Sequence, residues 1–124
     1  MSQKFIIEGR LPSLNEYIKA ERATKYAAST MKKTYQRRII ACIWKAHIKP
    51  VKNPVVLTYT HYVPDKRRDR DNIASIAHKF VQDALVSADI IKDDGWDDVL
   101  NSVDYWHIDK TDPRIVVTID EVEK

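Results

Sequence analysis

The chain has 124 residues, of which 44% are hydrophobic and 31% charged, and its formal net charge is +3 at pH 7. No stretch approaches the roughly 18 apolar residues of a membrane span, and the first residues lack the apolar core of a secretory signal. A single cysteine, Cys42, excludes an internal disulfide and a multi-thiolate zinc site. We therefore expect one cytoplasmic domain over residues 1–124, with no membrane association and no small-molecule cofactor.

The first half predicts a strand, a loop and a helix. Residues 4–9 have strand composition, and residues 10–26 are expected to form an irregular basic loop around Pro12. A helix should begin at Ser29 or Thr30 and end before Pro50, because the residue before a proline avoids helical geometry. Its apolar residues recur at steps of three and four, as on a buried face. That face comprises Met31, Tyr35, Ile39, Cys42, Ile43 and Ala46.

The second half predicts a strand over residues 55–63, where β-branched and aromatic residues alternate with others. A helix over residues 71–88 follows, with Asp71 or Asn72 as its N-cap. Its expected buried face comprises Ile73, Ile76, Ala77, Phe80, Ala84 and Ala88. Residues 103–109 and 114–122 resemble two strands joined as a hairpin. This order indicates an α/β or α+β fold with a mixed sheet and two main helices.

Charge is distributed unevenly along the chain. Residues 1–54 contain 12 lysines and arginines and 3 acidic residues, whereas residues 55–124 contain 9 and 15. This division predicts a basic surface for a polyanion beside an acidic region, although the basic side chains could simply solvate helix faces. The candidate phosphate contacts in the basic half are Lys19, Arg22, Lys25, Lys32, Lys33, Arg37 and Arg38.

Two acidic clusters flank the second predicted helix. Asp69 and Asp71 lie two residues apart, so in an extended connection both carboxylates would face one point. Carboxylates this close repel each other unless a cation or a proton lies between them, and the flanking arginines could supply that charge. If the connector after the helix leads back toward the loop before it, Asp93 or Asp94 could join Asp69 and Asp71. If the connector folds differently, Asp97 or Asp98 could replace Asp93. Such an oxygen-only group suits Mg²⁺ or Mn²⁺ rather than zinc.

A metal held in this way could support phosphodiester hydrolysis, because it activates water and stabilises charge on the phosphate. A nearby lysine could assist, and Lys79 is the only lysine on the second predicted helix. The simpler interpretation of Lys79 is an ion pair with Asp83, four residues later.

Residues 64–96, PDKRRDRDNIASIAHKFVQDALVSADIIKDDGW, resemble the hallmark region of the RusA family of Holliday junction resolvases, which phages and prophages often carry. The family pattern is Asp-x-Asp-Asn, a helix with a lysine before Asp-Ala-Leu, and then a paired-Asp segment. Residues 69–72, Lys79, residues 83–85 and residues 93–95 match it, and the segment LPSLNEY at residues 11–17 resembles the N-terminal motif of the family.

The resemblance implies a homodimer that binds a four-way DNA junction and cuts two opposed strands with Mg²⁺ or Mn²⁺. It implies that Asp69, Asp71 and Asp94 are metal ligands, with Asp93 as a neighbour, and that Lys79 is the catalytic lysine. The interval between Asp71 and Lys79 is one helical turn longer than in the best-known member of the family. Ser75 lies one turn before Lys79, at the position nearer to Asp71. The basic residues expected near the cut site are Lys66, Arg67, Arg68 and Arg70.

Two alternatives remain open at this stage. The chain could be a nuclease with a broader range of branched substrates, such as flaps and forks, or a non-catalytic basic DNA-binding module of a phage. The four histidines lack metal-ligand spacing and are expected to be structural or exposed. Trp96 directly follows the acidic turn, and for that reason we single it out among the three tryptophans.

Overall fold

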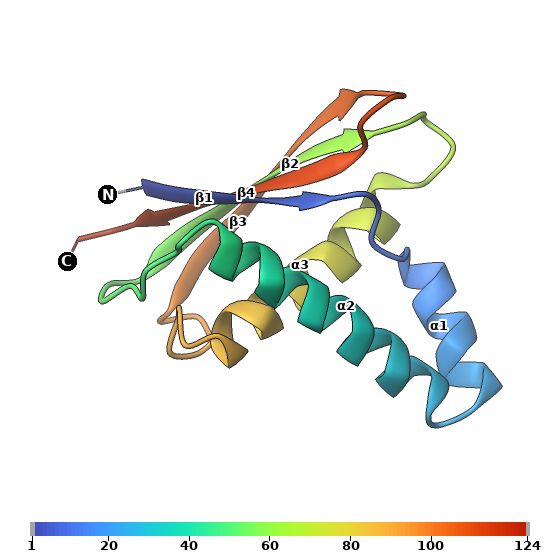
Figure 1. Cartoon of the computed structure of the whole chain (residues 1–124), viewed down its shortest axis with the longest axis horizontal. Coiled ribbons are helices and arrows are strands. Elements are labelled where there is room, and N and C mark those ends of the chain that lie inside the picture. Colours follow the sequence, from blue (N-terminus) through green and yellow to red (C-terminus); the bar gives the residue numbers. More distant parts are fainter. Residues whose placement is uncertain (1, 124) are drawn as a thin grey trace.

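The computed structural model describes residues 2–123, which form a mixed α+β fold of two layers. One layer is a four-stranded mixed sheet, and the other consists of three helices that cover one face of that sheet (Figure 1). The elements are β1 (Ser2–Glu8), α1 (Leu14–Ala23), α2 (Ala27–Lys45), β2 (Val55–Val63), α3 (Arg70–Ser87), β3 (Val99–Ile108) and β4 (Arg114–Glu121). None of the helices among residues 2–123 has the length and apolar character needed to cross a membrane.

The strand order is β1-β4-β2-β3, so β1 and β3 are the edge strands. β2 and β3 pair in parallel and are connected through α3, whereas β4 runs antiparallel to both β1 and β2. The expected hairpin between the last two strands is therefore wrong, because β2 lies between them. β4 buries Ile115, Val117 and Ile119 in alternation, so one of its faces contributes to the core.

The loop expected over residues 10–26 is also wrong, because residues 14–23 form α1. Ser13 caps this helix: the Glu16 amide donates to Ser13 Oγ at 3.2 Å, and the Ser13 hydroxyl donates to Glu16 Oε1 at 3.3 Å. The bond from the Glu16 amide to Ser13 Oγ is one half of a capping box, and an N-cap bond of this kind starts a helix even without strong apolar periodicity. No residue of α1 is fully buried, although Tyr17 packs edge-on against Phe80 with 5.7 Å between ring centroids.

The two predicted helices are confirmed with shifted ends. α2 begins two residues earlier than expected, and Ala46 is its exposed C-cap rather than a buried residue. α3 begins after Asp69, which is the N-cap in place of Asp71 or Asn72. Ile73 and Ala88 are only half-buried. The buried residues of α3 are Ile76, Ala77, Phe80, Val81, Ala84 and Leu85.

Candidate functional site

The N-terminal end of α3 carries the first acidic pair. Asp69 has an extended backbone (φ −67°, ψ 130°), and its Oδ1 accepts a hydrogen bond of 2.9 Å from the Asp71 amide. Capping therefore joins the Asp69 carboxylate to the backbone of Asp71, and the extended geometry expected for both residues is present only at Asp69. Ser75 donates its hydroxyl to the Asp71 carbonyl at 2.7 Å, one turn further along. Both aspartates are exposed, and their position at a helix N-terminus stabilises the negative charge.

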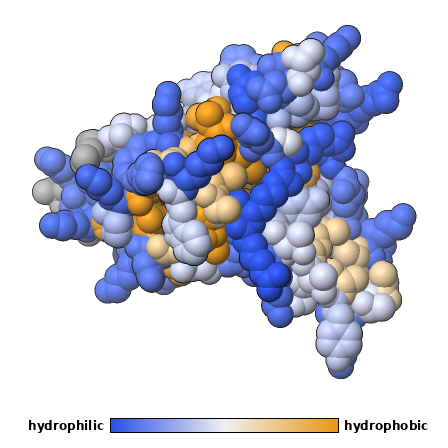
Figure 2. Space-filling model, viewed as in Figure 1, coloured by the Kyte–Doolittle hydropathy of each residue, from blue (hydrophilic) through white to orange (hydrophobic). Residues whose placement is uncertain are grey.

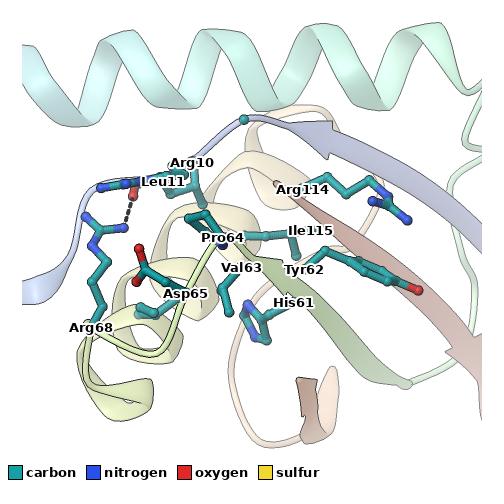
Figure 3. Close-up of a pocket in the computed structure, with 12 residues that line it drawn as sticks. Arg10, Leu11, His61, Tyr62, Val63, Pro64, Asp65, Arg68, Arg114 and Ile115 are labelled. Atoms are coloured by element: carbon teal, nitrogen blue, oxygen red, sulfur yellow. Dashed lines mark hydrogen bonds between the residues drawn. The ribbon is translucent and has the colours of Figure 1, made fainter. Parts of the chain in front are cut away.

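A shallow hollow lies beside Asp69, between the start of α1 and the start of α3. Ser13, Asn15, Arg67, Arg68, Asp69 and Asn72 line it. The two sequence segments that carry the family resemblance, residues 11–17 and 69–72, thus lie next to each other in space. Arg68 joins them, because its guanidinium donates to the Leu11 carbonyl at 3.3 Å (Figure 3). Arg68 also forms an ion pair with Glu16. This ion pair lowers the pKa of Glu16 against the opposing effect of partial burial.

The second acidic cluster lies at the other end of α3. Asp93 and Asp94 are exposed in the connector to β3, where Asp93 Oδ1 accepts from the Asp94 amide at 2.8 Å. The intervening α3 has 18 residues, which corresponds to about 27 Å of helix. Among residues 2–123 no group of three acidic, histidine or cysteine side chains is arranged to hold a metal ion. The carboxylate trio expected from the sequence is therefore not assembled within one chain.

Lys79 and its expected partner are separated in the structure. Lys79 is exposed on α3, eight residues after Asp71, or about 12 Å along the helix axis. Asp83 does not pair with it but forms an ion pair of 2.8 Å with Lys32 of α2, which raises the pKa of Lys32.

The predicted DNA-binding residues divide into two groups. Three form close hydrogen bonds or ion pairs within the chain: Lys32 with Asp83, Arg68 with Glu16, and Arg38 with the backbone carbonyl of Glu8. Arg67 pairs with Asp65 only at 4.0 Å, and its side chain is 90% exposed. The others have exposed side chains in the described structure, and Arg70 also lies over the ring of Trp106. They are Lys19, Arg22, Lys25, Lys33, Arg37, Lys66, Arg67 and Arg70. Hydrophilic side chains accordingly cover most of the helical face, with hydrophobic ones gathered near β1 and the C-terminal half of α2 (Figure 2).

A partly buried polar cluster between α3 and the sheet was not predicted. Asp104 of β3 accepts from His61 Nε2 of β2 at 2.7 Å and from His78 Nε2 of α3 at 3.0 Å. His61 is fully buried, and its other ring nitrogen, Nδ1, has no hydrogen-bond partner among the described residues. Burial lowers the pKa of His61, and the bond to Asp104 opposes that shift. One signal was present in the sequence, since His61 continues the inward alternation of Leu57 and Tyr59.

The chain matches no protein-family model, and no curated protein matches it either. The functional interpretation therefore depends on the residues themselves and on the geometry described above.

Proposed function

We propose that this chain is a metal-dependent endonuclease for branched DNA, and more specifically a resolvase that makes paired nicks in four-way junctions. The observation that carries the proposal is the exposed pair of carboxylates, Asp69 and Asp71, at the start of α3. Three exposed basic side chains from the same segment, Lys66, Arg67 and Arg70, lie beside them in the chain. Acidic side chains at the centre of a phosphate-binding surface oppose binding unless a cation neutralises them.

The donor set fits a hard divalent cation. Asp69 uses Oδ1 to cap α3, which leaves Oδ2 available, and Asp71 offers its carboxylate from the first turn. One or two carboxylates, completed by water and substrate phosphate, are a common way of binding Mg²⁺ in proteins. The chemistry that Mg²⁺ or Mn²⁺ supplies is activation of water and stabilisation of charge on the scissile phosphate. Lys66, Arg67 and Arg70 would hold the backbone of the DNA against this position.

The proposal includes a homodimer. Because α3 separates Asp93 and Asp94 from Asp69 and Asp71 in one chain, Asp94 would reach the same metal only from a second chain. A two-fold dimer also presents two copies of one site at a fixed separation, as the symmetric cutting of a four-way junction requires. Lys79 is retained as the candidate catalytic lysine, acting from the exposed side of α3.

Two other functions are weighed against this one. A nuclease with broader specificity for flaps and forks would use the same site and differ only in its substrate. A basic DNA-binding module without catalysis would explain the exposed basic residues, but it would give no role to carboxylates beside them.

The test is nicking of a synthetic four-way junction in Mg²⁺, Mn²⁺ or EDTA. We expect cutting only with metal, and we expect Asp71→Asn to lose cutting while it still binds the junction. Asp89→Asn is the matched control, because Asp89 is exposed and has a positive φ of 59° that asparagine tolerates well. Equal binding of junction and linear duplex would refute the resolvase assignment. Absence of metal-dependent cutting of any branched DNA would favour the binding module.

A further inference from the structure

β1 forms one open edge of the sheet. In an antiparallel ladder the amide and the carbonyl of a residue point to the same side, and that side alternates along the strand. The Gly9 amide donates to the Pro113 carbonyl at 2.9 Å, so Gly9 and the alternate residues before it point toward β4. The backbone groups of the residues between them, Lys4, Ile6 and Glu8, therefore point to the open edge.

Only one end of this edge is occupied within the chain. The Arg38 guanidinium of α2 donates to the Glu8 carbonyl, as expected for a residue whose backbone faces outward. Among residues 2–123, no hydrogen bond from another segment reaches the outward amides and carbonyls of Lys4 and Ile6. Unpaired backbone groups on an edge strand are a template for pairing with a further extended segment.

A groove of about 420 Å³ runs beside the open edge, between β1 and α2. It is lined by Lys4, Phe5, Ile6 and Glu8 of β1 and by Arg38, Cys42, Lys45 and Ala46 of α2. The α2 residues recur at steps of three and four, so they form one stripe along the groove. Hydrophobic side chains gather at this place on the surface (Figure 2). From Lys4 to Glu8 the strand extends about 14 Å, which matches roughly four or five residues of an extended peptide.

The rim of the groove is basic. Lys4, Arg38 and Lys45 are exposed cations, and Glu8 is the one acidic residue among the described residues that line it. Charge therefore favours an occupant with carboxylate side chains. DNA does not match the strand edge, because phosphates accept hydrogen bonds but donate none, and the outward carbonyls need donors. A polypeptide backbone supplies both donors and acceptors.

We propose that the groove between β1 and α2 binds an extended, acidic segment of a partner protein, which pairs with β1 as a fifth strand of the sheet. Backbone hydrogen bonds to Lys4 and Ile6 hold the segment, and its carboxylates lie beside Lys4 and Lys45. The inference goes beyond the proposed function, because neither Asp69 nor Asp71 lines this groove. A second copy of the chain is disfavoured as the occupant, because pairing two β1 edges would bring the basic rims of both copies together.

Cys42 gives a direct readout of occupancy. It is the only cysteine in the sequence, it lines the groove, and its side chain is half-buried. Burial raises the pKa of its thiol, so its reaction with Ellman's reagent is followed at mildly alkaline pH. The probe is a displayed library of random decapeptides, selected on the full chain. We expect the selected peptides to be rich in Asp, Glu and β-branched residues, and each peptide at ten times its Kd should slow the modification of Cys42 about 10-fold.

Two substitutions separate backbone pairing from charge. Ile6→Pro removes the outward amide, which an edge strand tolerates, and it should raise the Kd of a selected peptide about 10-fold. Ile6→Val is its control, because valine keeps the amide and the β-branched side chain. Lys45→Glu reverses a charge on the rim and should also raise Kd about 10-fold. Lys92→Glu is the matched control, because Lys92 is exposed in the connector after α3 and does not line the groove. Circular dichroism verifies that each variant is folded.

A test on the unaltered chain needs no substitution. Methylation of alternate backbone amides of a selected peptide removes the donors that face β1 in one methylated form and leaves them intact in the other. One form should therefore lose binding, and the other should keep it. Equal binding by both forms would refute strand pairing.

Four further results would overturn the inference. Selection that yields no peptide able to protect Cys42 would show that the groove takes no such segment, and equal peptide binding by Ile6→Pro would exclude the open edge as its site. Self-association that Ile6→Pro abolishes would assign the edge to a second copy, and protection of Cys42 by a four-way junction would assign the groove to DNA. Nicking by Ile6→Pro should match the wild type, so failure of this inference and failure of the proposed function are distinguishable.

Discussion

Asp104 offers the sharpest test of how α3 is held against the sheet. Its carboxylate accepts hydrogen bonds from His61 and His78, which come from β2 and α3. In Asp104→Ala, the imidazole of His61 stays buried and loses its only hydrogen bond within the described structure, since Nδ1 has none. A buried donor left without a partner costs about 1–3 kcal/mol. His78, whose side chain is 28% exposed, can turn to water and loses about 0.5–1 kcal/mol.

The free energy of unfolding of Asp104→Ala should therefore be lower than that of the wild type by about 1.5–4 kcal/mol. Urea unfolding followed by circular dichroism measures this difference, with the slope m compared to verify that the unfolded states are alike. Asp112→Ala is the control, because Asp112 is 64% exposed and pairs with Arg114 only at 3.4 Å, so its loss should change stability by less than about 0.5 kcal/mol. A change of similar size in both variants would refute the role assigned to Asp104.

Three further predictions concern titration, loop attachment and DNA binding. Burial lowers the pKa of His61 in the folded chain, so below the ordinary pKa of 6.5 the unfolded chain binds a proton more readily than the folded chain does. The free energy of unfolding should therefore fall as pH drops through that value. Urea unfolding at several pH values should show a smaller fall for His61→Phe. Arg68→Ala should detach the start of α1 from the loop before α3, and amide hydrogen exchange in residues 11–16 should become faster. Arg67→Ala is the control, because the Arg67 side chain is exposed and its loss should leave that exchange unchanged. Lys33→Gln combined with Arg37→Gln should weaken junction binding and reduce the slope of log K against log salt by about 2, measured by titration at several salt concentrations; an unchanged slope would exclude these side chains as phosphate contacts.

The elements that the sequence predicted well are those with strong periodicity. β2 spans residues 55–63 as expected, because its alternating β-branched and aromatic residues bury one face against the helices. α2 and α3 were found from their apolar stripes, with ends displaced by one or two residues. α1 was missed because it buries no residue completely and is specified instead by the Ser13–Glu16 cap.

Features that depend on contacts between distant segments could not be predicted from the sequence. The alternating residues of β4 would suit pairing with either β2 or β3. In the structure β4 pairs with β2, and β2 therefore lies between β4 and β3. Local capping decides the position of Asp69, whose carboxylate accepts from the Asp71 amide, and a common metal at Asp69 and Asp71 stays a prediction. The distance of this pair from Asp94 depends on the length and direction of α3, which local spacing does not reveal.

The basic residues differ in whether their side chains already have partners within the chain. Composition cannot distinguish an arginine that joins two segments of the chain from one that is available to DNA. Eleven basic residues were predicted to contact phosphates, and Lys32, Arg38 and Arg68 make hydrogen bonds or ion pairs within the chain. If the remaining eight each neutralise one phosphate, the salt slope per chain is at most about −7. The electrostatic attraction of DNA is therefore bounded, and a preference for junctions over duplex must come from the relative positions of two such surfaces in a dimer.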